Sequence, residues 1–224
     1  EAGSGAGSAA PTPSGKTAGI HATVLEEAAP EPTRNAKGQL VFEGLDGFLP
    51  TLTPKQVLQA GAFGGTYFRP IKSGVTGELY ANAWKEFPSD WFEGLSTAHI
   101  SSKKYQKHLN RYGVKCGGSL EMWESSGWMS NLDPYGWFQW YCRAYLGRRT
   151  TDDERQVKRW RGVAHGRFQA QLINKCAAAG KTFDDVSVSP VIRQALLHWG
   201  YELTEADANA YLKKKGKPPL VPAE

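Results

Sequence analysis

The sequence has little cysteine, and its histidines are not spaced as metal ligands. Its 224 residues include three cysteines, Cys116, Cys142 and Cys176, an odd number at wide intervals, which argues against a disulfide framework and excludes a CxxC zinc pattern. None of the five histidines belongs to an HxH or HExxH motif. We therefore predict no metal site, no cofactor and an intracellular, reducing compartment, with the interior of a plastid or mitochondrion as a candidate location.

Long apolar runs are also missing. The most apolar stretch contains Gln139 and Arg143 and is followed by Arg148 and Arg149. A membrane-spanning helix needs about twenty consecutive apolar residues. We predict that the chain does not cross a membrane.

No group of residues matches a catalytic motif. The acidic clusters Asp152–Glu154 and Asp184–Asp185 stand where helix starts and turns are expected, which explains them without catalysis. The glycine-rich segment Gly61–Arg69 is not followed by the Lys-Ser/Thr pair of a phosphate-binding loop, so we interpret it as a tight loop whose backbone passes close to another element. We predict no catalytic residues, and keep an enzyme site around the Gly61–Arg69 loop as an alternative.

Aromatic residues, in contrast, are abundant. Eight Trp, nine Tyr and nine Phe provide much of the buriable surface of a globular body. Six of the twelve residues from Pro134 to Tyr145 are aromatic, so a helix there must be buried almost all round. Asp133 is expected to cap this helix, Pro134 suits its first turn, and Gly147 can end it in the left-handed conformation.

The composition divides the chain into three parts. Residues 1–38 form a low-complexity extended tail, residues 39–216 a helical domain and residues 217–224 a Pro-rich C-terminal end. The predicted fold is mainly α: a single compact helical domain around a buried aromatic helix, with a long irregular N-terminal tail.

Caps and apolar spacing predict further helices. They cover residues 53–61, 78–85, 103–113, 119–126, 152–178, 190–199 and 204–214. Thr151 and Glu154 have the spacing of a capping box at the start of the long helix 152–178. Gly162 and Gly166 inside this helix suggest that another backbone approaches it closely.

Basic residues gather in several places. Net charge is +5 with a pI near 9.0, and residues 143–175 contain nine Lys and Arg against three acids. Partner-binding candidates are Lys103, Lys104, Lys107, Arg111, Arg148, Arg149, Lys158, Arg161, Lys213, Lys214 and Lys215. Spacing also places His165 on one helical stripe with Lys158 and Arg161, where phosphate could be met.

Four motifs resemble a protein family of algae, fungi and some bacteria for which no activity is assigned. They are GAFGGTYFRPI at 61–71, DWFEGL at 90–95, YGVKCGGSLEMWESSGW at 112–128 and DPYGWFQWYCRAYLGRR at 133–149. The resemblance covers roughly residues 41–200. It implies a stable, self-contained, α-rich domain and transfers no catalytic residues.

Three functions are consistent with these features. The leading hypothesis is a non-enzymatic accessory or linker subunit of a larger, organellar assembly, which contacts other proteins through its N-terminal tail and basic faces. The second is an RNA- or DNA-binding module that uses the basic region 143–175. The third is the enzyme with a site around the Gly61–Arg69 loop.

Overall fold

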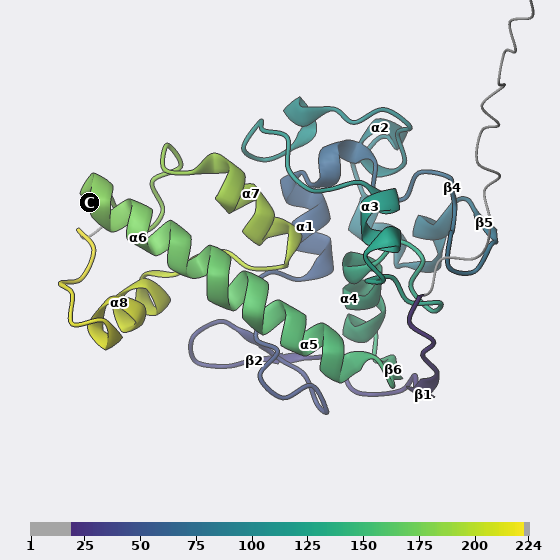
Figure 1. Cartoon of the computed structure of the whole chain (residues 1–224), viewed down its shortest axis with the longest axis horizontal. Coiled ribbons are helices and arrows are strands. Elements are labelled where there is room, and N and C mark those ends of the chain that lie inside the picture. Colours follow the sequence, from purple (N-terminus) through teal and green to yellow (C-terminus); the bar gives the residue numbers. More distant parts are fainter. Residues whose placement is uncertain (1–18, 222–224) are drawn as a thin grey trace, which may run out of the picture.

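The computed structural model describes residues 19–221, and the fold is helix-rich with only short two-stranded sheets (Figure 1). The helices are α1 (Pro54–Ala60), α2 (Thr97–Ile100), α3 (Leu120–Ser125), α4 (Trp137–Tyr145), α5 (Asp153–Gly162), α6 (Gln169–Ala179), α7 (Pro190–His198) and α8 (Glu205–Lys214). The antiparallel pairs are β1 (Val24–Glu26) with β6 (Arg149–Thr150), β2 (Thr33–Arg34) with β3 (Leu40–Val41), and β4 (Ile71–Lys72) with β5 (Leu79–Tyr80). Between residues 19 and 221, no helix is both long enough and apolar enough to span a bilayer.

The aromatic helix α4 is buried, as predicted. Phe48, from the segment between β3 and α1, is fully buried and stands at the centre of the surrounding rings. Its centroid lies 5.3 to 5.7 Å from those of Trp137, Trp140, Tyr141 and Trp160, mostly edge-on. Such edge-to-face pairs add to the free energy gained by burying the rings. The core therefore forms where α4 and α5 meet Phe48.

Helix α4 begins later than expected, because Asp133 does not cap it. The helix starts at Trp137, after Gly136 with a φ of +88°, and no side chain caps it. The carboxylate of Asp133 instead accepts hydrogen bonds from Arg143 and Arg148. At the other end, Gly147 has a φ of +100° and ends the helix as predicted.

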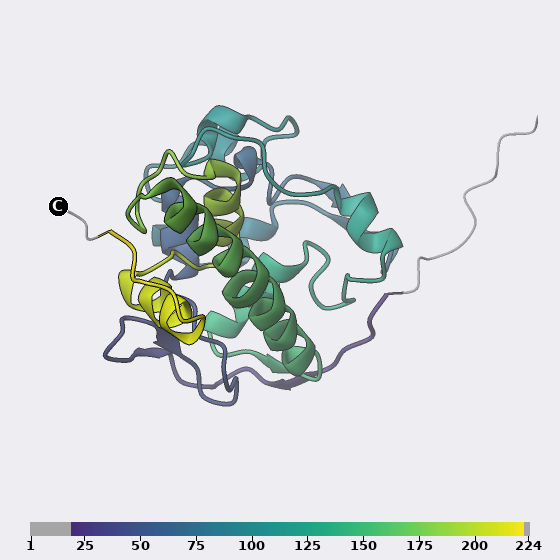
Figure 2. The same ribbon diagram turned by 60° about the vertical axis from the view of Figure 1, so that its left-hand side comes forward.

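The predicted helix 152–178 is one long element, made of α5, a π-helical turn (Val163–Phe168) and α6, and α8 packs beside it (Figure 2). A Cβ at Gly166 would lie 2.7 Å from a carbonyl oxygen of the same helix, and Gly162 faces open space. The predicted approach of another backbone is therefore wrong. The two glycines flank or lie in the π-turn, where the helical ladder is locally widened.

The start of α5 also differs from the prediction. The capping box of Thr151 and Glu154 does not form. Instead, Asp153 accepts hydrogen bonds from the backbone N–H and the hydroxyl of Thr150, at 3.0 and 2.7 Å. Asp153, one residue earlier than Glu154, therefore holds the residue that precedes the helix, and its side chain is buried; no side chain caps the first turn of α5 within residues 19–221.

Local caps correctly predicted several shorter helices, and two predicted helices are wrong. Thr53 forms a capping box on α1, and Thr204 accepts from a backbone N–H of α8. Residues 78–85 contain β5 and part of a 3-10 turn (Ala83–Glu86) in place of a helix. Residues 103–113 contain only a short 3-10 turn (Lys107–Leu109) within an irregular loop.

Residues 19–38, part of the predicted N-terminal tail, make contacts with the helical body. The N–H of Ile20 donates to the carbonyl of Met129, and the N–H of Ala22 donates to Oδ1 of Asn131 at 2.7 Å. Strand β1 follows and pairs with β6. At the other end of the chain, Leu220 is buried in the core. The predictions for residues 1–18 and 222–224 concern residues outside the described range.

Candidate functional site

The most clearly built surface feature is the segment between α2 and α3, residues 101–116, which we call the basic loop. The side chain of Asn110 holds it: Oδ1 accepts from the N–H of Gly64, and Nδ2 donates to Tyr105 Oη and to the carbonyl of Val114, all at 2.7 Å. The hydroxyl of Tyr105 in turn donates to the carbonyl of Cys116 and accepts from its N–H. These partly buried bonds replace the helical ladder that the sequence predicted here.

The glycines of the Gly61–Arg69 segment form the floor of this loop, which confirms their interpretation as a close backbone approach. A Cβ at Gly61 would lie 2.4 Å from the carbonyl oxygen of Leu109, and one at Gly65 would lie 1.9 Å from that of Ala98. At Gly64 it would lie 2.7 Å from the ring of Tyr105. No side chain larger than hydrogen fits at these positions unless its neighbours move: the basic loop at Gly61 and Gly64, and α2 at Gly65.

The cations of the basic loop point outwards. Lys103, Lys104, Lys107 and Lys115 are exposed, and no carboxylate of residues 19–221 lies within salt-bridge distance of them. Arg111 pairs with Glu202 at 2.9 Å, with both side chains partly exposed. The structure thus brings four of the predicted contact residues, Lys103, Lys104, Lys107 and Arg111, onto one fixed loop.

Lys213, Lys214 and Lys215 form a separate basic group. They are exposed and lie at the C-terminal end of α8, where the partial negative charge of the helix dipole favours a cation. This location gives them an ordinary structural role in addition to any partner contact.

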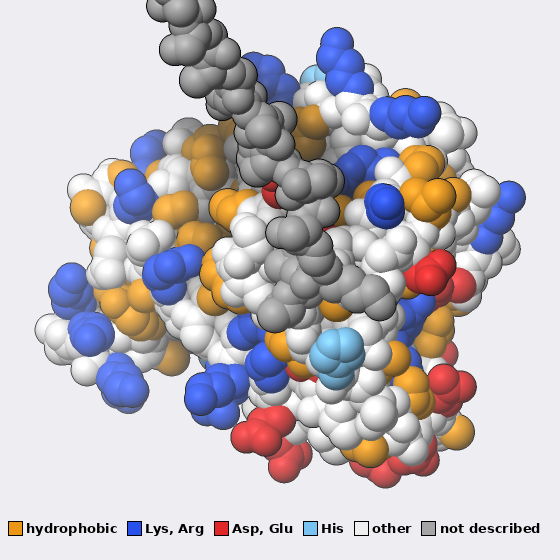
Figure 3. All heavy atoms as spheres, turned by 45° about the vertical axis from the view of Figure 1, so that its right-hand side comes forward, with side chains coloured by type: hydrophobic (Ala, Val, Ile, Leu, Met, Phe, Trp, Pro, Cys, Tyr) orange, Lys and Arg blue, Asp and Glu red, His pale blue; other side chains and the backbone are white. Residues whose placement is uncertain are grey.

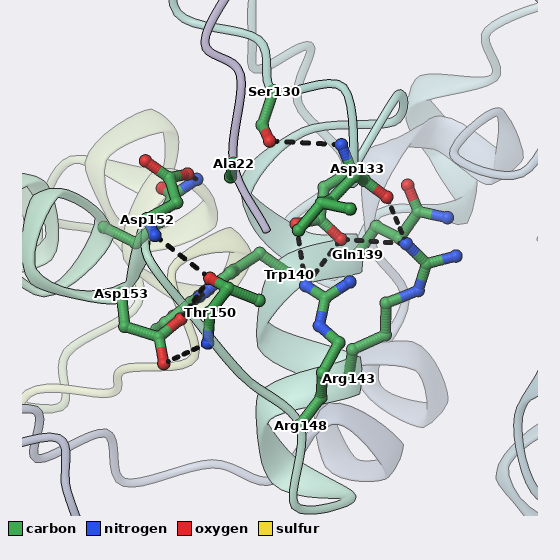
Figure 4. Close-up of polar contacts among 12 residues, drawn as sticks. Ala22, Ser130, Asp133, Gln139, Trp140, Arg143, Arg148, Thr150, Asp152 and Asp153 are labelled. Atoms are coloured by element: carbon green, nitrogen blue, oxygen red, sulfur yellow. Dashed lines mark hydrogen bonds and ion pairs between the residues drawn. The ribbon is translucent and has the colours of Figure 1, made fainter. Parts of the chain in front are cut away.

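Much of the charge predicted in residues 143–175 is used inside the protein (Figure 4). The carboxylate of Asp133, 1% exposed, accepts from Arg148 at 2.7 and 2.8 Å and from Arg143 at 3.0 Å. Arg143 also forms a two-pronged pair with Glu86. Burial raises the pKa of Asp133 even beside these two cations, because the carboxylate loses its hydration.

Two of the predicted contact residues, Arg148 and Arg149, do not lie at the surface. Both are buried, and Arg149 donates to the carbonyls of Glu43, Ala144 and Arg148. A partner cannot reach guanidinium groups that are enclosed and hydrogen-bonded in this way. Arginine is suited to such positions because its planar fork serves several acceptors at once.

Lys158 and Arg161 remain exposed, but in a surface of mixed charge. They line a shallow hollow of about 500 Å³ together with Asp46, Asp153 and Glu154. Three acids beside two cations do not form an uninterrupted track for a phosphate backbone. A second crevice, beside Arg111, has a volume of about 10 Å³, room for about one water molecule.

His165 adds little positive charge to this helix face. Its ring stacks on Trp160, with centroids 5.3 Å apart, and its Nε2 lies 4.0 Å from a carboxylate oxygen of Asp207. Burial lowers the pKa of His165, so the ring is neutral at pH 7. The predicted phosphate stripe of Lys158, Arg161 and His165 therefore has two cations, not three.

The structure assembles little that resembles a reaction centre. Among residues 19–221, no three His, Cys, Asp or Glu side chains are grouped closely enough to hold a metal ion. The Gly61–Arg69 loop lines neither of the two hollows. Burial raises the pKa of Cys116 to about 11, so its thiol is protonated at neutral pH and a weak nucleophile.

The sequence did not predict a stack of two indoles and a guanidinium, which we call the indole clamp: Trp128, Arg159 and Trp199. Cζ of Arg159 lies 5.7 Å from the ring centroids of both tryptophans. Trp128 is 46% exposed. The one signal in the sequence was Trp128, a tryptophan that fits no helical pattern. The other two members of the clamp are distant in sequence, since Arg159 lies in α5 and Trp199 directly follows α7.

No family model, no curated protein and no solved structure matches this chain. The family resemblance of the four motifs therefore stays a prediction, and function must be inferred from the residues themselves.

Proposed function

We propose that this protein is a non-enzymatic binding subunit of a larger assembly, attached through its basic loop to an acidic surface of a partner protein. The observation that carries this proposal is the fixed shape of the loop. Asn110, Tyr105 and the glycine floor hold its backbone without regular secondary structure, while its lysines face solvent.

A rigid loop of this kind favours binding for a physical reason. Association costs free energy when a flexible segment must be ordered, and this loop is ordered beforehand by its own buried bonds. The lysines of the loop have no carboxylate of residues 19–221 within salt-bridge distance. On the face drawn in Figure 3, most Asp and Glu side chains lie in the lower half, whereas Lys and Arg side chains lie in both halves. Charge separation steers an acidic partner to one side of the molecule.

The other two hypotheses receive less support. An enzyme around Gly61–Arg69 would need a concave site there, but the glycines pack directly against neighbouring atoms. A nucleic-acid module would need the arginines of residues 143–175 at the surface, but Arg143, Arg148 and Arg149 serve internal acceptors.

The test is purification of the tagged full chain from the cells that make it, over a series of salt concentrations. We expect a partner protein to co-migrate with the chain at native salt and to dissociate as added salt screens the contact. Nuclease treatment should not release this partner. The variant Lys103→Glu/Lys104→Glu/Lys107→Glu should lose this partner.

A matched control separates the loop from net charge. The variant Lys37→Glu/Lys72→Glu/Lys85→Glu has the same change of charge at exposed positions outside the loop and should keep the partner. A lone monomer at every ionic strength, or equal loss in both variants, would contradict the proposal. Loss of the partner on nuclease treatment would replace it by the nucleic-acid module.

A further inference from the structure

The indole clamp holds a cation whose position is set by the core. The ring of Trp199 packs on Trp137 of α4, with centroids 4.6 Å apart, so one side of the clamp is part of the folded interior. Trp128 forms the other side and precedes α4 in the chain. Two indole faces orient the guanidinium of Arg159 by cation–π attraction.

Arg159 has no acidic partner among residues 19–221. Its one side-chain hydrogen bond within this range runs from Nη1 to Oε1 of Gln156 at 3.2 Å. The neighbouring Arg155 is neutralised by Asp152, at 2.5 and 2.7 Å. Burial, and then repulsion by Arg155, lowers the pKa of Arg159 to about 10, so the side chain is still a cation at neutral pH. Most of its N–H donors are left for an outside acceptor.

The exposed side of the clamp has the composition of a binding hot spot. Tryptophan and arginine are the residues whose truncation most often weakens a protein interface. Trp128 offers nearly half of its surface beside the guanidinium. An occupant would therefore need an acceptor for Arg159 and an apolar group for the indole.

We propose that the indole clamp docks an acidic segment of a partner protein, with one carboxylate on Arg159 and a neighbouring apolar side chain over Trp128. This inference rests on the proposed function and adds a second contact to it. A carboxylate fits the planar guanidinium fork with two parallel hydrogen bonds. A nucleic-acid strand fits less well, because it needs a track of several cations and the adjacent Arg155 is already paired.

The test measures binding of two labelled probes to the full chain by fluorescence anisotropy at low salt. One probe is a peptide of glutamates with a central leucine, and the other is a dT oligonucleotide of equal charge. Arg159→Lys keeps the charge but loses the planar fork, and we expect it to weaken peptide binding about 10-fold. Trp128→Ala should weaken it by a similar factor.

Matched controls are available at other exposed positions. Arg167→Lys changes an exposed arginine that stacks on Phe168, and Leu79→Ala truncates a side chain that is 80% exposed. Both should leave peptide affinity within about 2-fold. Urea unfolding of Arg159→Lys confirms that the variant is folded before its affinity is compared.

The outcomes separate the two proposals. Weaker peptide binding in Arg159→Lys, with no such change for the oligonucleotide, supports the clamp. If the Lys103/Lys104/Lys107 triple variant loses the peptide and Arg159→Lys does not, the clamp inference fails and the proposed function survives. If the oligonucleotide binds more tightly and depends on Arg159, the clamp is a nucleic-acid site and the inference is overturned.

Discussion

Replacement of Asp133 should destabilise the fold more than replacement of any exposed acid. Its carboxylate is 1% exposed and is the only acid within salt-bridge distance of Arg148 in the described part of the chain. Arg148 is itself 9% exposed. Asp133→Ala would leave this guanidinium buried without a counter-ion. Breaking a buried pair from one side costs about 3–5 kcal/mol, a large part of the stability of an ordinary domain.

Removal of both charges should cost less than removal of one. The pKa of Asp133 is raised by burial although two arginines touch it, which indicates that the pair gains little beyond the cost of its own desolvation. In addition, Nε of Arg148 has no hydrogen-bond partner within residues 19–221. The variant Asp133→Leu/Arg148→Met removes both desolvated charges and leaves Arg143 paired with Glu86. We expect it to lose about 2 kcal/mol or less, because side chains of similar volume can replace a buried ion pair.

Urea unfolding followed by tryptophan fluorescence measures these differences without screening the charges. The control is Asp90→Ala, whose pair with Lys55 is exposed and should change the midpoint very little. A loss of less than about 1 kcal/mol in Asp133→Ala would refute the reasoning, since it would match an exposed pair. A loss in Asp133→Leu/Arg148→Met as large as that in Asp133→Ala would also refute it.

Three further predictions use the same unfolding measurements. Burial lowers the pKa of His198 from 6.5 to about 3, so the unfolded chain binds this proton first as pH falls. The contribution of His198 to the free energy of unfolding is complete above pH 6.5 and falls as pH is lowered from there towards pH 3, by at most about 1.4 kcal/mol per pH unit. His198→Gln should therefore make the free energy of unfolding depend less steeply on pH between pH 7 and pH 5. Gly65→Ala should cost about 2–5 kcal/mol, and Gly94→Ala, with a similar φ and open space, only about 1–2 kcal/mol; equal losses would contradict the close approach at Gly65. Trp140→Phe removes the indole N–H that donates to Asp153 at 2.8 Å, and a fall of about 1–3 kcal/mol in the free energy of unfolding is expected; no change would mean that this bond contributes nothing net.

Local signals predicted the parts of this fold that depend on near neighbours. Thr53 and Thr204 cap their helices through backbone N–H groups three residues away, a contact that sequence spacing alone specifies. Gly147 ends α4 because the required φ suits glycine. The burial of α4 followed from its composition, since so many aromatic side chains leave no polar face for water.

The errors lie where distant partners compete with local preference. Residues 103–113 have apolar spacing compatible with a helix, but Asn110 bonds to Gly64, 46 positions earlier, and fixes a loop instead. Asp133 has the ideal place and type for a cap, but Arg148 and Arg143 draw its carboxylate away. In both cases tertiary hydrogen bonds outweighed a local preference, a helix cap or a helical spacing of apolar residues, that stabilises by only about 1 kcal/mol.

The candidate site divides in the same way. Sequence marked Lys103, Lys104, Lys107 and Arg111 as a basic group, and in the structure these four residues are exposed on one loop. It could not distinguish them from Arg148 and Arg149, because an arginine that serves internal acceptors has the same local pattern as one at the surface. The indole clamp brings together residues from positions 128 to 199, and no spacing rule connects them.

Composition and spacing by themselves determined that this chain folds around a buried aromatic helix, which glycine ends and which a longer helix follows. Only the tertiary structure decided which charged side chains are buried and bound to internal acceptors and which face solvent. The physical reason is that burying an aromatic ring depends mainly on the ring itself, whereas the free energy of a charge depends on the acceptors that the rest of the chain places around it.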